Sequence, residues 1–315
     1  MYYIGIDIGG TGVKAGVVSP EGKILVKDSV ETNVDAGYKK IVSDTAELVK
    51  KVVSDAKITL DDVKSIGIGC PGSIDDKTGV VVYANNLGFK NAPICSELKK
   101  YIDKPIYINN DANCAALGEF FALNDDSVED FIAVTLGTGV GGGVIIDKKL
   151  YTGFNSVAGE LGHTVIVVDG EQCTCGRKGC WEAYASATAL IRETEKAAAN
   201  NPDSLLAAMI KENGGKANGK IPWDAMQSGD AVGKQVIDMY VKYVSEGIIN
   251  LINTFQPNVV AIGGGISRQG DNLLTPVRKY IEDKCYGGGL VPASKIVMAQ
   301  LGNEAGIIGA AFLGK

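Results

Sequence analysis

Three cysteines and the single histidine of the chain lie close together in the sequence. Cys173, Cys175 and Cys180 fall within eight residues, and His163 lies ten residues before the first of them. Soft thiolates and an imidazole at this spacing suit Zn²⁺, which takes four such ligands in a closed tetrahedral site. The alternatives are a set of buried apolar thiols or a redox pair, although Cys-x-Cys differs from the usual Cys-x-x-Cys form. The sequence therefore predicts a structural zinc ion on these four residues.

Two carboxylates flank this cluster. Glu160 lies three residues before His163, and Glu182 lies two residues after Cys180. If zinc binds one imidazole nitrogen of His163, the other nitrogen remains available to a ligand. Each glutamate alone would face solvent by default. Two carboxylates and an imidazole at one place would instead favour a ligand with several hydroxyl groups.

A glycine-rich turn near the N-terminus has the composition of a phosphate site. It reads Asp7-Ile8-Gly9-Gly10-Thr11 and lies between two predicted strands. Glycines allow backbone N–H groups to approach an anion closely. The Asp7 carboxylate would orient Mg²⁺ through water, since Mg²⁺ prefers carboxylates together with phosphate oxygens. The structural alternative is an ordinary hairpin turn with a surface aspartate.

Two further glycine-rich segments are candidates for contacting a nucleotide. The first covers residues 137–143 and matches Gly-x-Gly-x-x-Gly, but a strand follows it, whereas the dinucleotide fingerprint requires a helix. The second, Gly263-Gly264-Gly265, lies between a predicted strand and a predicted helix and is by itself more often a turn. The chain has no Gly-x-x-x-x-Gly-Lys-[Ser/Thr] sequence, which disfavours a P-loop kinase.

A carboxylate at the end of a predicted buried strand is the candidate general base. Asn110 and Asp111 follow the strand at residues 105–109 and open a helix. Both residue types are favoured helix caps, which is the structural alternative. In phosphoryl transfer to an alcohol, a carboxylate accepts the hydroxyl proton, and Asp111 is the residue placed for that role.

Strands and helices alternate along most of the chain, which predicts an α/β fold. Shifting the sequence by 127 residues places residues 10–13 on residues 137–140 within the same strand–turn–strand context. This repeat predicts two duplicated domains with a cleft between them.

We expect a small domain at residues 1–112 and 300–315 and a larger one at 113–299. Strands are expected at residues 2–8, 13–19, 23–30, 65–69, 105–109, 131–136, 143–147, 258–262 and 295–299, and helices at 37–56, 110–122, 231–255, 271–285 and 305–313, with residues 183–256 mostly helical apart from a break at 213–220.

Composition limits the class of protein. The chain has 315 residues, a net charge of −6 and a pI near 5.0, which argues against nucleic acid or an anionic membrane as partner. Its seven cysteines are odd in number and no secretion signal precedes them, so reduced thiols and a cytoplasmic location are expected. No apolar run approaches the roughly 18 residues of a membrane span.

Taken together, these motifs resemble those of the ROK family, within the actin-like ATPase superfamily, over essentially the full length. The resemblance implies two duplicated actin-like, ribonuclease H-like domains and, within the family, is strongest to bacterial glucokinases. The matching stretches are Asp7–Thr11, Asn110-Asp-Ala-Asn113, Gly137–Gly143, Glu160-Leu-Gly-His163, Cys173-Thr-Cys-Gly-Arg-Lys-Gly-Cys-Trp-Glu182 and Gly263–Gly265.

The resemblance also implies the roles of individual residues. It implies Asp111 as base, zinc on the cluster of three cysteines and one histidine, and a hexose, ATP and Mg²⁺ as substrates and cofactor. A homodimer is expected on the same ground. The implied sugar contacts are Asn110, Asp111, Glu160, His163 and Glu182, with Gly72 and Asn86 as further positions, and the predicted nucleotide contacts are Asp7, Gly9, Gly10, Thr11, Lys14, Gly137, Thr138, Gly139, Gly263, Gly264 and Gly265.

Three functions compete. The first is phosphorylation of a hexose at its 6-hydroxyl, with glucose preferred and N-acetylmannosamine, fructose, allose and mannose as alternatives. The family also contains transcriptional repressors, which carry an N-terminal helix-turn-helix extension, whereas this sequence starts on the phosphate-site strand. A sugar-sensing module without catalysis would be expected to lack Asp111 or the phosphate turn. The residues therefore favour the kinase.

Overall fold

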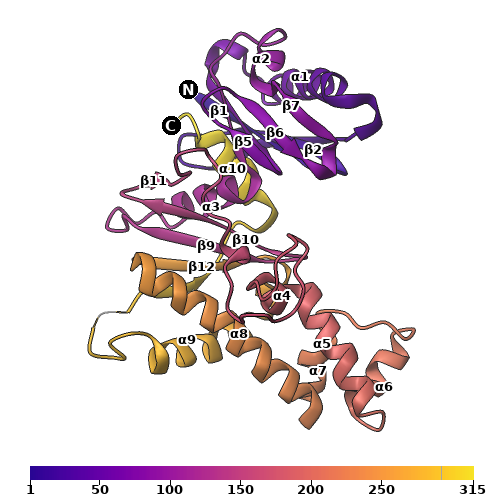
Figure 1. The fold of residues 1–315 in the computed structure, drawn as a ribbon. Helices are drawn as coiled ribbons and strands as arrows, with labels where there is room; N and C mark the ends of the chain where they lie inside the picture. The colour runs from indigo at the N-terminus through magenta and orange to yellow at the C-terminus, as the bar shows by residue number, and fades with distance from the viewer. Residues whose placement is uncertain (292) are drawn as a thin grey trace. The chain divides into compact units, whose positions relative to one another are not determined.

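The computed structural model describes residues 1–291 and 293–315. The chain divides into two compact units. Unit 1 comprises Met1–Ala133, Gly142–Gly159 and Gln300–Lys315, and unit 2 comprises Val134–Gly141 and Glu160–Ala299. Figure 1 shows both units as ribbons and labels many of their helices and strands.

A five-stranded mixed sheet forms the centre of unit 1. Its order is β3-β2-β1-β4-β8; β1 pairs antiparallel with β2, while β4 lies parallel to β1 and to β8. Buried residues occupy successive positions of β1, as expected for a strand covered on both faces. The strands are β1 (Tyr2–Ile8), β2 (Gly12–Val18), β3 (Ile24–Glu31), β4 (Val63–Cys70) and β8 (Ile106–Asn110).

The longer helices that contact the strands of this sheet are α1 (Gly37–Asp55), α3 (Asp111–Ala122) and α10 (Ala305–Phe312). The helix α1 contacts β2 and β3, whereas α10 contacts β1, β4 and α3. Glycines allow α10 to lie directly on the strands: a Cβ on Gly5 would come within 1.8 Å of the Ile307 carbonyl oxygen. A Cβ on Gly118 of α3 would come within 2.3 Å of the Ala305 carbonyl oxygen.

The close packing of α3 on α10 explains a difference from the expected domain boundary. We predicted a boundary after residue 112, which would assign α3 to the larger domain. The division falls after Ala133 instead, and Gly142–Gly159 also belongs to unit 1. Helix α3 contacts α10 and β4, so it is part of the core of unit 1. Its sequence carries no information about that partner, because α10 lies near the opposite end of the chain.

The second five-stranded sheet has the order β11-β10-β9-β12-β13. This order repeats that of the first sheet, with a run of hairpin-connected strands followed by two later strands, which confirms the predicted duplication. Strand β10 begins at Val140, three residues before the expected position. The strands are β9 (Phe131–Leu136), β10 (Val140–Ile146), β11 (Lys149–Leu150), β12 (Val259–Gly263) and β13 (Lys295–Met298).

Helices make up most of unit 2. The predicted break at residues 213–220 separates two of them, and the predicted long helix is α8 (Ala231–Phe255), capped by the Asp230 side chain, which accepts from the Gly233 N–H. Trp181 is fully buried, and Gly247 of α8 leaves room for its ring. The other helices are α4 (Glu182–Ala185), α5 (Ala187–Asn200), α6 (Leu205–Glu212), α7 (Ile221–Gln227) and α9 (Asp271–Lys284).

A small three-stranded sheet in unit 1 was not predicted. It consists of β5 (Ser73–Asp75), β6 (Val80–Ala84) and β7 (Phe89–Ala92), followed by α2 (Ile94–Lys99). The run of valines before Asn85-Asn86-Leu87-Gly88 is the signal that indicates this hairpin. The short 3₁₀ helices are η1 (Val34–Ala36), η2 (Leu60–Asp62), η3 (Asn85–Leu87), η4 (Leu161–His163), η5 (Gly265–Gln269) and η6 (Gly302–Glu304).

Candidate functional site

The first glycine-rich turn joins β1 to β2 in unit 1. The Gly9 N–H donates to the Gly12 carbonyl at 2.9 Å, and the Thr32 hydroxyl donates to the Gly9 carbonyl at 2.6 Å. Asp7 lies opposite Lys14 in the β1–β2 register, with 3.5 Å between carboxylate and ammonium. The side chain of Asp7 is 25% exposed, so its carboxylate remains partly open to a ligand.

Two of the predicted sugar positions, Asn86 and Gly72, also lie in unit 1. A Cβ on Gly10 would come within 3.3 Å of the Asn86 carbonyl oxygen, so the η3 turn lies against the glycine-rich turn. Gly72 adopts φ +100°, and a Cβ there would lie 2.1 Å from the Tyr83 carbonyl oxygen. No other residue fits this position. The Asn110 side-chain amide donates to the Gly72 carbonyl at 3.2 Å.

Asn110 and Asp111 take different places at the start of α3. Asn110 is the N-cap, since its side-chain oxygen accepts from the backbone N–H groups of Ala112 at 2.9 Å and Asn113 at 3.3 Å. Asp111 is the first helical residue, and its exposed carboxylate accepts from the Ala112 N–H at 2.9 Å. Capping thus accounts for Asn110, whereas the Asp111 carboxylate lies at the positive end of the helix dipole and faces outward.

A buried polar network lies beneath this helix start. The Asn109 side-chain oxygen accepts from the Asn110 backbone N–H and from the Asn113 side-chain amide, both at 2.9 Å. Asp76 accepts from the Ser156 hydroxyl at 2.7 Å and lies 3.5 Å from the Asn109 amide nitrogen. Asn109 and Asn113 are both buried. Asn109, Asn113, Asp76 and Ser156 were not predicted as site residues. Asn109 directly precedes the predicted pair Asn110-Asp111 and Asn113 lies two residues after it, and this proximity is the signal that indicates them.

Two buried thiols of unit 1 have pKa values that burial and nearby carboxylates raise. Burial raises the pKa of Cys70, and the carboxylates of Asp111 and Asp7 raise it further. The pKa of Cys114 is raised for the same reasons, with Cys70 adding a smaller contribution. Both cysteines therefore remain neutral thiols. Two predicted site residues, Asp7 and Asp111, thus lie near the same buried sulfur atoms.

Glu119 is a buried carboxylate that the sequence did not indicate. Its two oxygens accept from the backbone N–H groups of Gln300 at 2.7 Å and Leu301 at 2.9 Å. These donors precede α10, so Glu119 ties α3 to the segment with which the chain re-enters unit 1. A carboxylate with two backbone donors is well compensated for burial.

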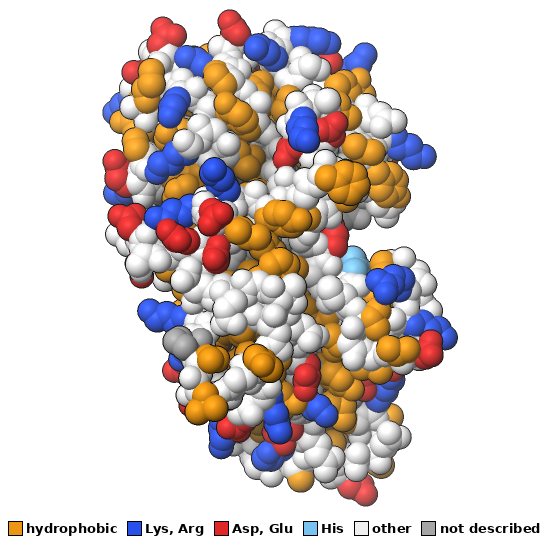
Figure 2. Space-filling view, turned by 60° about the vertical axis from the view of Figure 1, so that its left-hand side comes forward, with side chains coloured by type: hydrophobic (Ala, Val, Ile, Leu, Met, Phe, Trp, Pro, Cys, Tyr) orange, Lys and Arg blue, Asp and Glu red, His pale blue; other side chains and the backbone are white. Residues whose placement is uncertain are grey.

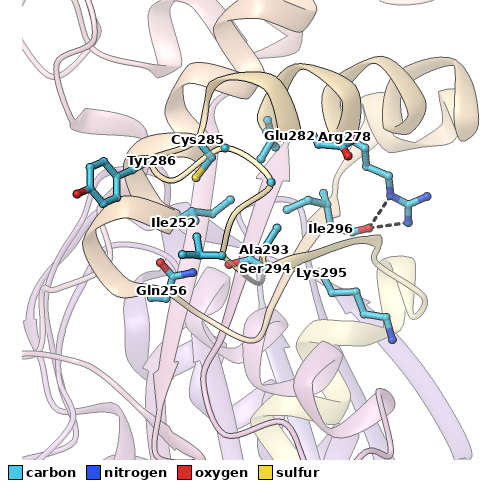
Figure 3. A pocket seen from close by; sticks show the side chains of 14 residues that line it. Ile252, Gln256, Arg278, Glu282, Cys285, Tyr286, Ala293, Ser294, Lys295 and Ile296 are labelled. Carbon is cyan, nitrogen blue, oxygen red and sulfur yellow. Dashed lines mark hydrogen bonds between the residues drawn. The ribbon is translucent and has the colours of Figure 1, made fainter.

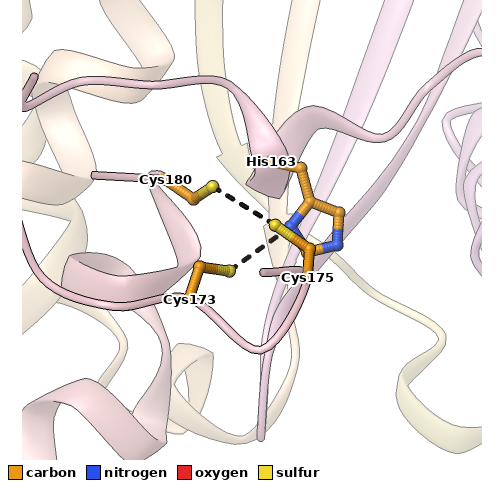
Figure 4. A group of neighbouring side chains, drawn as sticks. All are labelled: His163, Cys173, Cys175 and Cys180. Carbon is orange, nitrogen blue, oxygen red and sulfur yellow. Dashed lines mark hydrogen bonds between the residues drawn. The ribbon is translucent and has the colours of Figure 1, made fainter. Parts of the chain in front are cut away.

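The histidine and three cysteines gather in unit 2. Figure 4 shows the three sulfur atoms and the imidazole pointing toward one another. The Cys173 sulfur lies 3.6 Å from Nδ1 of His163, and the Cys175 and Cys180 sulfurs are 3.6 Å apart. All four ligand atoms lie within 4.8 Å of one another. A tetrahedral zinc with Zn–S bonds of about 2.3 Å separates its ligands by roughly 3.5–3.8 Å, so the donor set fits zinc.

The thiols of this cluster differ in their acidity. The backbone N–H of Arg177 lowers the pKa of Cys175, which is exposed. Burial raises the pKa of Cys180 to about 12, and the neighbouring thiols add to the shift. A bound cation reverses the second effect, because a coordinating thiol is deprotonated.

The glycine-rich segments of unit 2 lie beside the cysteine cluster and beside each other. One Glu182 oxygen accepts from the Val140 N–H at 3.1 Å, and the other lies 3.2 Å from the Thr174 hydroxyl. Gly264 has φ +86° and lies against Leu136, where a Cβ would come within 2.5 Å of the carbonyl oxygen. Leu136 directly precedes Gly137, so two of the predicted nucleotide segments meet in this unit.

Glu160 and the face of His163 remain accessible. Glu160 is exposed and precedes η4, where its carbonyl accepts from the His163 N–H at 3.1 Å. With Nδ1 of His163 directed at the cysteines, Nε2 is the nitrogen left for a ligand. The pale-blue imidazole is visible at the surface in Figure 2, where basic and acidic side chains lie interspersed over the face in view.

A pocket of about 350 Å³ in unit 2 lies apart from the predicted residues. It is lined by α8, α9 and the segment before β13, as Figure 3 shows, and includes none of the residues predicted for the site. Arg278 in its wall donates from two nitrogens to the Ile296 carbonyl, at 3.0 and 2.6 Å. Its guanidinium is therefore engaged in holding β13 to α9.

In the described part of the chain, no helix combines the length and apolar character that crossing a membrane requires.

Comparison with known proteins assigns a family to this arrangement. The sequence pattern of the ROK family matches residues 3–315. The chain is 35% identical to a glucokinase of Halalkalibacterium halodurans, covering 100% of this chain and 95% of that protein. It is 37% identical to a glucokinase of Thermotoga maritima, covering 98% and 96%. A crystal structure of a ROK family glucokinase from Streptomyces griseus, in complex with glucose and AMPPNP, matches with 36% identity, 99% coverage of both chains and a TM-score of 0.80.

Proposed function

The chain belongs to the ROK family, and on that premise we propose that it is an ATP-dependent hexose kinase that phosphorylates the 6-hydroxyl of glucose. The identity of 35–37% to glucokinases over nearly the whole of both chains carries this proposal. The placement of Asp111 supports it, because a kinase acting on an alcohol needs a carboxylate at the reacting hydroxyl.

We assign the proton transfer to Asp111. Its carboxylate accepts the proton of the sugar 6-hydroxyl while the hydroxyl oxygen forms a bond to the γ-phosphorus of ATP. The bond between that phosphorus and the oxygen bridging to the β-phosphate breaks, and ADP leaves. The Asn110 cap and the buried Asn109–Asn113 pair hold the first turn of α3, so the carboxylate is positioned before substrate binds.

Candidate contacts to sugar hydroxyls are proposed within each unit taken by itself. In unit 1, Asn110 and Asn86 present amides, and Gly72 has the backbone conformation that only glycine fits. In unit 2, Glu160, Glu182 and Nε2 of His163 supply acceptors or donors for further hydroxyls. Amides, carboxylates and an imidazole suit hydroxyl groups, since each hydroxyl both donates and accepts.

Candidate contacts to phosphate are proposed in the glycine-rich segments of each unit taken by itself. In unit 1, the turn Gly9–Thr11 offers backbone N–H groups, while Lys14 and Asp7 lie at its base. In unit 2, the adjoining segments Gly137–Gly139 and Gly263–Gly265 offer further close approaches of backbone to phosphate. Asp7 would hold Mg²⁺ through water, and that ion would neutralise charge on the phosphate oxygens.

A structural zinc ion is assigned to His163, Cys173, Cys175 and Cys180, whose donor atoms match a closed tetrahedral site. Zinc would fix the imidazole of His163 in one orientation, with Nε2 outward.

The chain's acidic balance and the mixed charges in Figure 2 support small molecules as partners in preference to nucleic acid. A homodimer in the cytoplasm is proposed on the family relation.

The experiment that tests this function is turnover of purified protein with MgATP and a panel of hexoses. ADP release is measured with glucose, mannose, fructose, allose and N-acetylmannosamine, and the phosphorylated carbon is identified by NMR. The proposal expects the highest kcat/KM with glucose and a 6-phosphate product. A higher kcat/KM with another sugar would reassign the substrate, and binding of sugar without any ADP release would favour the sugar-sensing regulator.

A further inference from the structure

Glu182 connects two segments of unit 2 that the proposed function treats separately. One carboxylate oxygen accepts from the Val140 N–H at 3.1 Å. The other lies 3.6 Å from the Cys173 sulfur and accepts from the Thr174 hydroxyl at 3.2 Å. The same side chain therefore contacts the cysteine loop on one side and the end of the glycine-rich segment Gly137–Val140 on the other.

The glycine-rich segment is shaped to receive this carboxylate. A Cβ on Gly139 would lie 2.3 Å from the Glu182 oxygen that bonds to Val140, so only glycine leaves the space open. Glu182 is half-buried, and a charged acceptor for a backbone N–H forms a stronger hydrogen bond than a neutral one.

The segment η4, which carries His163, also touches Val140. Gly162 of η4 precedes His163, and a Cβ on Gly162 would lie 2.1 Å from the Val140 carbonyl oxygen. The backbone of η4 and that of Val140 are thus in direct contact. Both parts of the chain that contribute metal ligands bear on one residue, one through its N–H and the other against its carbonyl.

From this geometry we propose that Glu182 is a positioning residue that couples the metal site to nucleotide binding. With zinc bound, Cys173 and His163 are fixed, Glu182 holds the Val140 N–H, and the segment Gly137–Val140 keeps the conformation that receives phosphate. Without zinc, the loop carrying residues 173–180 loses its constraint, Glu182 releases Val140, and nucleotide affinity falls. This inference rests on the proposed nucleotide role of residues 137–139.

Coupling of this kind is reciprocal. If zinc raises the affinity for nucleotide by some factor, nucleotide raises the affinity for zinc by the same factor. Loss of one hydrogen bond to a charged acceptor corresponds to about a tenfold change in affinity. We therefore expect zinc removal to weaken AMPPNP binding about tenfold, and saturating AMPPNP to tighten zinc binding about tenfold.

The test measures hydrogen exchange of the Val140 amide, zinc content and AMPPNP binding in the full chain without sugar. In the wild type, chelation of zinc should accelerate Val140 exchange. In Glu182→Ala, exchange should be fast with or without zinc, and AMPPNP affinity should no longer depend on zinc. Glu171→Ala removes a carboxylate of the same loop that pairs only with Lys196 among the described contacts, and it should behave as the wild type.

A second variant covers the case in which chelation unfolds the cysteine loop altogether. Gly139→Ala leaves all four metal ligands intact and displaces the Glu182 carboxylate, which is the movable partner in that contact. It should retain one zinc per chain and show fast Val140 exchange, whereas slow Val140 exchange in this variant would contradict the role of Glu182.

The outcomes distinguish this inference from the proposed function. Slow Val140 exchange in Glu182→Ala would overturn the coupling, as would a wild type in which the Val140 exchange rate does not change when zinc is removed. Neither result would bear on ATP-dependent turnover. If zinc-loaded wild type shows zinc-dependent Val140 exchange but binds no AMPPNP, the nucleotide role proposed for this segment is wrong.

Discussion

Nδ1 of His163 lies 3.6 Å from the sulfur of Cys173, although ten residues separate them in the chain. The 3₁₀ turn η4 carries the histidine, and the loop of residues 173–180 returns beside it through bridges of Val165 to Cys180 and Gln172 to Lys178. Backbone pairing therefore brings the donor atoms together. Nε2 is left on the opposite side, where the proposed function assigns it to a sugar hydroxyl.

Replacing one thiol of this cluster should release the metal. In Cys175→Ser, a hard hydroxyl takes the place of a soft thiolate, so we expect zinc content to fall from one per chain to near zero and residues 160–182 to become more mobile. Elemental analysis and hydrogen exchange measure the two effects. Cys285→Ser, in the same unit and outside the cluster, is the matched control and should keep its zinc. A wild type that holds no zinc when purified without chelator would contradict the assignment.

Removing the carboxylate of Asp111 should abolish proton transfer while keeping the fold. In Asp111→Asn the cap provided by Asn110 remains, so stability should change little, and sugar affinity by calorimetry should stay within a few-fold of the wild type. Loss of a general base lowers kcat by about 10²–10⁴-fold. Asp126→Asn, an exposed carboxylate in the loop after α3, is the control and should retain full turnover. Turnover of Asp111→Asn close to that of the wild type would exclude this residue as the base.

Neutralising Asp7 should affect the nucleotide and leave the sugar unaffected. Asp7→Asn removes the proposed Mg²⁺-orienting carboxylate and leaves Lys14 without its partner. That exposed ion pair contributes little to folding, at most about 1 kcal/mol. We expect kcat/KM for MgATP to fall at least about tenfold, as loss of an interaction with a charged group predicts. Glucose binding measured without nucleotide should be unchanged; a loss of glucose affinity equal to that for MgATP would indicate a general distortion of unit 1.

Truncating Glu119 should destabilise unit 1 without touching a proposed ligand site. Glu119→Ala leaves the backbone N–H groups of Gln300 and Leu301 without acceptors in a buried place, a cost of about 2–4 kcal/mol. Glu119→Gln retains one acceptor, so its free energy of unfolding should fall by roughly half as much as that of Glu119→Ala. Urea unfolding and exchange of those two amides provide the measurement. Glu212→Ala, at the exposed end of α6, controls for loss of a glutamate. Equal stability of Glu119→Ala and Glu212→Ala would contradict the stabilising role of the Glu119 hydrogen bonds to Gln300 and Leu301.

The sequence by itself determined the features that depend on residue type at fixed local spacing. The strand–glycine–strand units follow from periodicity and turn residues, and their repetition predicted the duplicated sheets. The candidate metal donors could be named because thiols and imidazole are rare and their chemistry is specific. Asn110 could be placed at a helix start because its cap hydrogen bonds reach only two and three residues along the chain.

Only the tertiary structure decided which distant groups meet. Glu119 finds its donors 181 and 182 residues away, and Glu182 finds Val140 42 residues away. Likewise, α3 packs with α10 through glycines whose role is invisible until the two helices lie in contact. No local pattern encodes such pairs, because the partner is chosen by packing of whole elements. Glu182, which the sequence indicates as a sugar ligand, therefore also contacts both the cysteine loop and a glycine-rich turn in the folded chain.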